Sequence, residues 1–214
     1  MRLGRFAVTA AAGGALLIVA TAATLALLRL RAPDPAPVVN VHVPAELLVS
    51  EGQPPAIPLP ASGSLTVAQP GAGRLADLAG ANVRPIGSVA KAMTAFVVLT
   101  AHPLTPGAEG PTLTMTATDV TLYREAVAAQ GSALFVSEGE RLTERQLLLA
   151  LLLPSANNIA ETLARWVGGT RQDFIAMLNE RAAALEMGDT HFDDPSGVSD
   201  ATVSTTHDLV RLAS

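Results

Sequence analysis

The stretch RPIGSVAKAMT, residues 84–94, decides how the rest of the chain is interpreted. Its first four residues include a proline and a glycine, which interrupt regular structure. From Ser88 to Thr100 the side chains are apolar on nearly every side, with Ser88, Lys91 and Thr94 as the polar exceptions in the first two turns. This pattern predicts a helix over 88–100 that is buried at the centre of its domain.

Ser88 and Lys91 are three residues apart, so on a helix their Cβ atoms lie about 5–6 Å from each other. A serine hydroxyl is a weak nucleophile until a base removes its proton. An amine can be that base when burial lowers its pKa, and a helix N-terminus can stabilise an oxyanion. The alternative is that Ser88 is an ordinary N-cap and Lys91 extends to the surface.

The basic residues of the chain are thirteen arginines and one lysine, Lys91. Arginine does not lose its proton in proteins, so this lysine is interpreted as kept for its ability to become neutral, with chance as the alternative. The net charge of −5 and the pI of about 5.3 provide no basic surface for nucleic acid. The absence of cysteine excludes disulfides and thiol catalysis.

The N-terminal third is predicted to lie outside the globular domain. Residues 6–28 are uncharged and span roughly 35 Å as a helix, enough to cross a membrane. We interpret residues 1–31 as a signal-anchor, or as a signal peptide cleaved near Ala20-Thr21-Ala22. Residues 32–62 contain eight of the fifteen prolines and read as an extended linker. The domain itself is expected at 63–214.

Within this domain the patterns predict a short strand at 64–68 with a hairpin into 74–76, a short strand at 114–119 and a hairpin at 132–140. Helices are expected at 143–152, which a capping box opens, and at 158–167, 170–187 and 204–213. Residues 190–200 are expected to form a loop. His191, Asp193 and Asp194 in it could bind a metal, but a solvated loop is the simpler interpretation.

A second motif, Ser155-Ala156-Asn157, directly follows Pro154 at the end of a predicted helix. Its hydroxyl could relay a proton, and its carboxamide could hold a substrate amide. Alone, these residues are also typical of an ordinary turn.

The two motifs together, in this order, resemble those of serine-type D-alanyl-D-alanine carboxypeptidases, the low-molecular-mass penicillin-binding proteins of the β-lactamase-like superfamily. Residues 185–197 and 204–209 resemble further family segments, so the likeness covers roughly 63–214. The resemblance implies an α/β (α+β) fold of the DD-peptidase type, with a helical cluster packed on an antiparallel sheet.

By this resemblance, Ser88 is the acylated nucleophile, Lys91 its base, Ser155 a proton shuttle and Asn157 a ligand of the substrate backbone. The substrate is the D-Ala-D-Ala end of a peptidoglycan pentapeptide, and β-lactams acylate the same serine. No metal or cofactor and no nucleic acid is implied. With residues 6–28 in the cell membrane, the domain is expected outside the cytoplasm, or secreted if the segment is cleaved.

One departure from the family pattern is clear, since Lys91 is the only lysine and the family's downstream Lys-Thr-Gly strand cannot be in this sequence. We therefore expect a C-terminally truncated domain, lacking later sheet strands and impaired in activity. Two alternatives remain. A membrane-anchored, non-catalytic wall-binding or penicillin-sensing module fits the missing motif. A β-lactamase fits less well, because Ala156 stands where that class usually has Asp.

Overall fold

The computed structural model describes residues 57–214. The predicted membrane segment 6–28 and most of the predicted linker 32–62 lie outside the described residues. Among residues 57–214, none of the helices combines the length and the apolar character needed to span a bilayer. What the structure describes is thus the domain predicted at 63–214.

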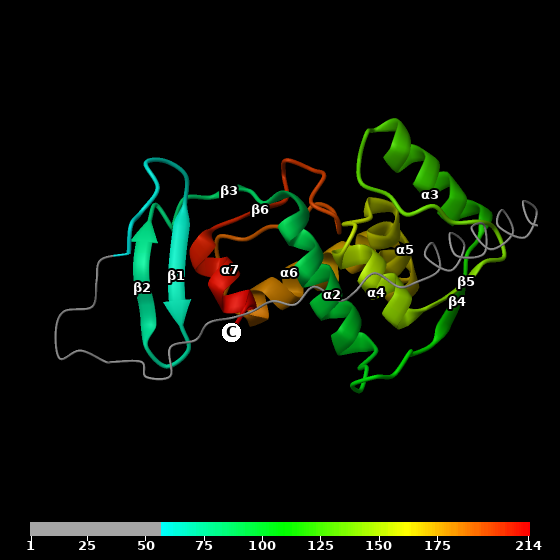
Figure 1. Ribbon diagram of the computed structural model, residues 1–214, viewed down its shortest axis with the longest axis horizontal. Coiled ribbons are helices and arrows are strands. Elements are labelled where there is room, and N and C mark those ends of the chain that lie inside the picture. The colour runs from blue at the N-terminus through cyan, green and yellow to red at the C-terminus, as the bar shows by residue number, and fades with distance from the viewer. Residues whose placement is uncertain (1–56) are drawn as a thin grey trace, which may run out of the picture. The chain divides into compact units, whose positions relative to one another are not determined.

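The strands of the described residues form three antiparallel pairs (Figure 1). These pairs are β1 (Leu65–Gln69) with β2 (Gly73–Leu78), β3 (Arg84–Pro85) with β6 (Val203–Ser204), and β4 (Thr112–Thr114) with β5 (Arg141–Thr143). The first pair confirms the hairpin predicted from 64–76. The second pair was not predicted, and it joins the segment before Ser88 to a segment near the C-terminal end of the sequence.

The helices of residues 57–214 are a short 3₁₀ turn and six α-helices: η1 (Gly87–Val89), α2 (Ala90–Ala101), α3 (Ala117–Ala128), α4 (Glu144–Leu152), α5 (Asn157–Gly168), α6 (Arg171–Ala184) and α7 (Thr206–Leu212). Five of them, α2 and α4 to α7, confirm predicted helices to within a few residues. The capping box that opens α4 is present, because the Thr143 hydroxyl accepts from the Gln146 amide and the Gln146 side chain accepts from the Thr143 amide. The architecture is α+β, with helices packed against small antiparallel sheets.

Two predicted β elements are wrong. The segment predicted as a strand at 114–119 contains the start of α3, because Thr116 and Asp119 form a capping box at Ala117. The hairpin predicted at 132–140 is an irregular loop. This loop is held by a side chain rather than by a strand partner: Asn158 of α5 accepts from the Leu134 amide and donates to the Leu134 carbonyl, both at 3.0 Å.

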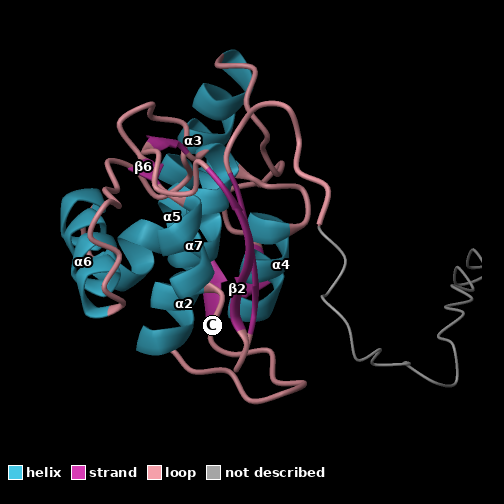
Figure 2. Cartoon of the chain, turned by 90° about the vertical axis from the view of Figure 1, so that its left-hand side faces the viewer, coloured by secondary structure: helices cyan, strands magenta, loops and turns pink. Residues whose placement is uncertain are grey.

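Helix α2 lies at the centre of the domain and packs against α4, α5 and α6. Figure 2 shows α4 and α6 on opposite sides of it. Met93 and Val98 of α2 are fully buried among side chains of these helices. The predicted burial holds for one side only, since Phe96 and Leu99 are 37% and 40% exposed. The helix that carries Lys91 is nevertheless the central element of the core.

A buried carboxylate joins α3 to α5. Asp119, 3% exposed, accepts from the Thr116 amide and hydroxyl at 2.7 Å, from the Thr162 hydroxyl at 2.7 Å and from the Arg165 guanidinium at 2.5 Å. Burial acts to raise the pKa of Asp119, but the hydrogen bonds from Thr116 and Thr162 and the charge of Arg165 lower it below its ordinary value.

We expect Asp119→Ala to lower the free energy of unfolding by about 2–3 kcal/mol at pH 7, because it removes the cap of α3 and leaves Arg165 without its acceptor. Since the folded pKa of Asp119 is depressed, its contribution is present above the unfolded pKa and is lost as pH falls through the folded pKa. Urea denaturation at pH 7 and at acidic pH measures both effects. The control is Asp173→Ala, which removes an exposed carboxylate from the first turn of α6; an equal loss in both variants would contradict the interpretation.

Candidate active site

Ser88 lies in the 3₁₀ turn η1 rather than at the start of an α-helix. The turn is positioned from both sides. Before it, β3 pairs with β6, and the Ile86 amide donates to the Thr202 carbonyl at 3.2 Å. Gly87 follows with a φ of +51°, a conformation that favours glycine. After it, α2 begins at Ala90. The exposed Ser88 is thus held at a sharp change of chain direction on the domain surface.

The Lys91 amine contacts the Ser88 hydroxyl. Its Nζ donates to Ser88 Oγ at 3.0 Å and to the backbone carbonyl of Ser196 at 2.8 Å. Lys91 is only 2% exposed, so the alternative of a surface-directed lysine is wrong. The structure brings together the two residues that the first motif paired.

Burial lowers the pKa of Lys91 from 10.5 to about 8, and the nearby carboxylate of Asp194 partly opposes this by favouring the ammonium form. A sizeable fraction of the amine is therefore neutral near physiological pH. A neutral amine 3.0 Å from a hydroxyl oxygen can accept its proton. This is the base that a serine nucleophile needs.

Ser155 sits in a strained turn between α4 and α5. Its φ is +58°, which is unusual for a residue with a side chain. Its Oγ is buried, and no hydrogen-bond partner for it exists among residues 57–214. An orphaned buried hydroxyl costs about 1–3 kcal/mol, and strain of this kind is concentrated at functional sites. The hydroxyl therefore has an unused hydrogen bond, and none of the side-chain hydrogen bonds among residues 57–214 joins Ser155 to Ser88 or Lys91.

Asn157 opens α5, and its backbone amide donates to the Ser132 carbonyl at 2.8 Å. Its side chain lies against Gly131, where any Cβ would come within 2.7 Å of Asn157 Nδ2. Together with Ser196 it borders a cavity of about 490 Å³. The remaining lining residues come from α3 and the segment that follows it, from α5 and α6, and from the 194–199 loop: Leu122, Glu125, Ala126, Ala129, Gly131, Asn158, Glu161, Arg171, Asp194, Val198 and Ser199.

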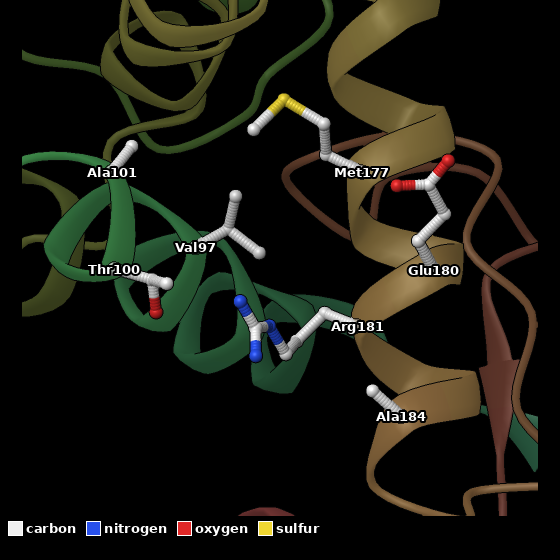
Figure 3. Close-up of a pocket in the computed structure, with 7 residues that line it drawn as sticks. All are labelled: Val97, Thr100, Ala101, Met177, Glu180, Arg181 and Ala184. Atoms are coloured by element: carbon white, nitrogen blue, oxygen red, sulfur yellow. The ribbon is translucent and has the colours of Figure 1, made fainter.

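A second cavity, of about 340 Å³, lies between the last turn of α2 and α6 (Figure 3). Val97 and Ala101 of α2 face Met177 and Arg181 of α6 across it. Ser88 lies just before the opposite end of α2 and Lys91 in the first turn there, and neither they nor Ser155 or Asn157 line this cavity. Ser88, Lys91 and Ser155 do not line the cavity of about 490 Å³ either, but Asn157 and Ser196 do. Because the Ser196 carbonyl accepts from Lys91, this is the cavity that adjoins the candidate site.

The sequence predicted a loop at 190–200, but it did not show that this loop contacts Lys91. The interpretation of 190–200 as solvated is right for His191 and Asp193, which are exposed, and wrong for Asp194 and Ser196, which are each 3% exposed. Within the described range, no group of three or more metal-type side chains is close enough to hold an ion. The clue in the sequence was Pro195-Ser196-Gly197, whose glycine adopts a φ of +78°.

A glycine is required at 197 because the loop touches the segment before Ser88. A Cβ at Gly197 would overlap the backbone carbonyl of Gly87. The loop thus contacts both sides of the candidate nucleophile: Gly87 before it and Lys91 after it. A buried base, an exposed hydroxyl, a second free hydroxyl and a carboxamide at an adjoining cavity are the parts that acyl transfer requires.

Comparison with known proteins supports this interpretation. Residues 61–214 match the family described as D-alanyl-D-alanine carboxypeptidase, peptidase family S11. A D-alanyl-D-alanine endopeptidase of Pseudomonas aeruginosa is 33% identical over 174 residues, which cover 77% of this chain and 52% of that protein. The chain thus spans about half the length of this relative.

Solved structures of the same kind share the fold. The DD-transpeptidase of Streptomyces K15 superposes with a TM-score of 0.61 at 30% identity, covering 71% of this chain and 58% of that one. A D-alanyl-D-alanine carboxypeptidase of Mycobacterium tuberculosis superposes with a TM-score of 0.61 at 31% identity, covering 74% of this chain and 57% of that one. These matches confirm the DD-peptidase type of fold.

The depressed pKa of Lys91 has a consequence for stability. Between about pH 8 and 10.5 the unfolded chain keeps a proton on Lys91 that the folded chain has released, so stability rises with pH in this window. Relative to Lys91→Met, we expect the free energy of unfolding of the wild type to increase by about 3 kcal/mol between pH 8 and pH 10.5. Chemical denaturation of both proteins at pH 7 and pH 11 measures the difference. A difference that does not change with pH would show that the amine is solvated.

Proposed function

The chain belongs to the D-alanyl-D-alanine carboxypeptidase family of serine peptidases, and from this membership we propose that it acts on peptidoglycan stem peptides as a serine-type D-Ala-D-Ala carboxypeptidase. The observation that carries the proposal is the 3.0 Å contact between Lys91 Nζ and Ser88 Oγ. An exposed hydroxyl beside a buried amine with a pKa of about 8 is an activated nucleophile.

In the proposed reaction, neutral Lys91 accepts the proton of the Ser88 hydroxyl as Ser88 Oγ bonds to the carbonyl carbon of the penultimate D-alanine. The bond from that carbon to the terminal amine breaks, and the proton is passed to the leaving D-alanine through the Ser155 hydroxyl. Water then hydrolyses the ester on Ser88 and releases the shortened peptide. The free Oγ of Ser155 supports its assignment to the transfer.

Asn157 is proposed to hold the substrate backbone. Its carboxamide can both donate to a peptide carbonyl and accept from a peptide amide. It lies at the cavity of about 490 Å³, which has room for several peptide side-chain atoms and is lined by both apolar and charged groups. The same arrangement makes the strained amide of a β-lactam a substitute for the D-Ala-D-Ala bond.

We further propose that residues 6–28 anchor the domain to the cell membrane, with residues 32–62 as a spacer on the extracytoplasmic side. The apolar length of the segment and the eight prolines that follow it support this placement. The alternative of a non-catalytic binding module is disfavoured, because such a module needs no lysine buried against a serine.

We expect a fluorescent penicillin to label the full chain once, at Ser88, because Ser88 Oγ opens the lactam and retains the acyl group. Gel fluorescence and peptide mass spectrometry locate the adduct. Ser88→Ala should abolish it, whereas Ser137→Ala, at an exposed serine of the 131–140 loop, should not. An adduct that persists in Ser88→Ala would contradict the assignment. Release of D-alanine from a pentapeptide and cleavage of a cross-linked peptide distinguish carboxypeptidase from endopeptidase action.

The acylation rate should increase as pH rises through about 8, since only the neutral form of Lys91 can accept the proton. Below that pH we expect the acylation rate to change by about tenfold per pH unit, because the neutral fraction of Lys91 does so. Lys91→Arg should be inactive at every pH, because the guanidinium stays charged. Stopped-flow or quenched labelling between pH 6 and 10 provides the profile. A flat profile, or an active Lys91→Arg, would rule out Lys91 as the base.

A further inference from the structure

Asp194 is buried in the loop between α6 and β6, and its carboxylate organises that loop. Oδ2 accepts from the Ser196 amide at 3.1 Å, the Ser196 hydroxyl at 2.6 Å and the Val198 amide at 2.9 Å. Oδ1 accepts from the Thr202 hydroxyl at 2.5 Å. Burial acts to raise the pKa of Asp194, but these hydrogen bonds lower it below its ordinary value, so the group is charged at neutral pH.

The loop that Asp194 holds is the part of the protein that contacts the candidate nucleophile and base from outside α2. The carbonyl of Ser196 accepts from Lys91 Nζ at 2.8 Å, and the carbonyl of Pro195 accepts from the Thr94 hydroxyl at 2.7 Å. Gly197 lies against the carbonyl of Gly87. A change in the loop therefore moves Lys91 and the turn containing Ser88 together.

We propose that Asp194 is a positioning residue for the acylation of Ser88: it holds the 194–202 loop so that the Ser196 carbonyl orients the Lys91 amine toward Ser88 Oγ. Asp194 does not itself reach the reacting atoms in this arrangement. It acts through the loop and through its negative charge. The inference rests on the proposed function, in which Lys91 is the base.

The charge of Asp194 also acts on Lys91 directly, since it favours the ammonium form that burial disfavours. The other charged groups around Asp194 are Glu161 of α5, paired with Arg171 of α6 at 3.2 Å, and Glu125 of α3 at the same cavity. Burial raises the pKa of Glu161, and the charge of Asp194 adds to this effect. Both residues line the same cavity. Loss of the Asp194 charge should therefore lower the pKa of Lys91, provided that the loop stays in place.

The single lysine makes this directly measurable. The 214-residue chain labelled with [¹³Cε]lysine in detergent solution has one lysine signal, and its pH titration reports the pKa of Lys91 alone. Asp194→Asn keeps the side-chain size and an oxygen acceptor for the loop amides. We expect this variant to titrate at a lower pH than the wild type, and its penicillin acylation profile to move to lower pH by the same amount.

Asp194→Ala removes the acceptors as well as the charge. We expect the loop to be released, the amine to become solvated and the pKa of Lys91 to rise toward its ordinary value. The acylation rate should fall by about 10²-fold, as expected when reacting groups are displaced by about 1 Å. If this variant does not fold, Thr202→Val tests the same contact, with Thr202→Ser restoring the hydroxyl and the rate.

The matched control is Asp193→Asn, which makes the same charge change at the neighbouring exposed residue, whose carboxylate accepts from the Ser199 hydroxyl. This variant should have the same lysine titration and the same pH profile of penicillin acylation as the wild type. Identical titrations of Asp194→Asn and Asp193→Asn would overturn the inference. If the wild type is never acylated while its lysine signal still responds to Asp194→Asn, the proposed function fails and the placement of Lys91 by Asp194 stands.

Discussion

The contact between the buried Lys91 amine and the Ser88 hydroxyl is the constraint to which the surrounding structure is adapted. An amine withdrawn from water is unfavourable unless its hydrogens find acceptors, and here Nζ donates to Ser88 Oγ and to the Ser196 carbonyl. The first acceptor is the candidate nucleophile. The same desolvation that destabilises the ammonium ion thus produces the base. Burial of the amine therefore lowers the free energy of unfolding while it makes Lys91 able to accept a proton.

Each segment that carries the candidate site contains a residue with a positive φ: Gly87 before Ser88, Ser155 before α5 and Gly197 in the 194–202 loop. At Gly87 and Gly197, two segments distant in the sequence approach closely. The β3–β6 pair and the bond from Ile86 to Thr202 hold these segments in register. Rigid supports on both sides of the turn are what allow a 3.0 Å contact to persist at the surface of a domain.

Two of the cavities within residues 57–214 show that space alone does not identify a site. The one between α2 and α6 has room but no nucleophile, whereas the one beside Asn157 adjoins the residue whose carbonyl holds Lys91. Helix α3 forms one wall of the cavity beside Asn157, and the buried Asp119 joins α3 to α5. The packing of a helix distant from Ser88 therefore shapes the space in which a substrate would lie.

Local signals in the sequence determined the helices with clear caps, the first hairpin and the pairing of Ser88 with Lys91, because these depend on residues a few positions apart. The Ser155-Ala156-Asn157 turn was equally visible. The strand expected at 114–119 and the hairpin at 132–140 failed because the Asp119 cap and Asn158 compete with strand formation. Only the tertiary structure showed that Asp194 is buried and that the Ser196 carbonyl meets Lys91. That contact joins residues 105 positions apart, and no local pattern specifies it.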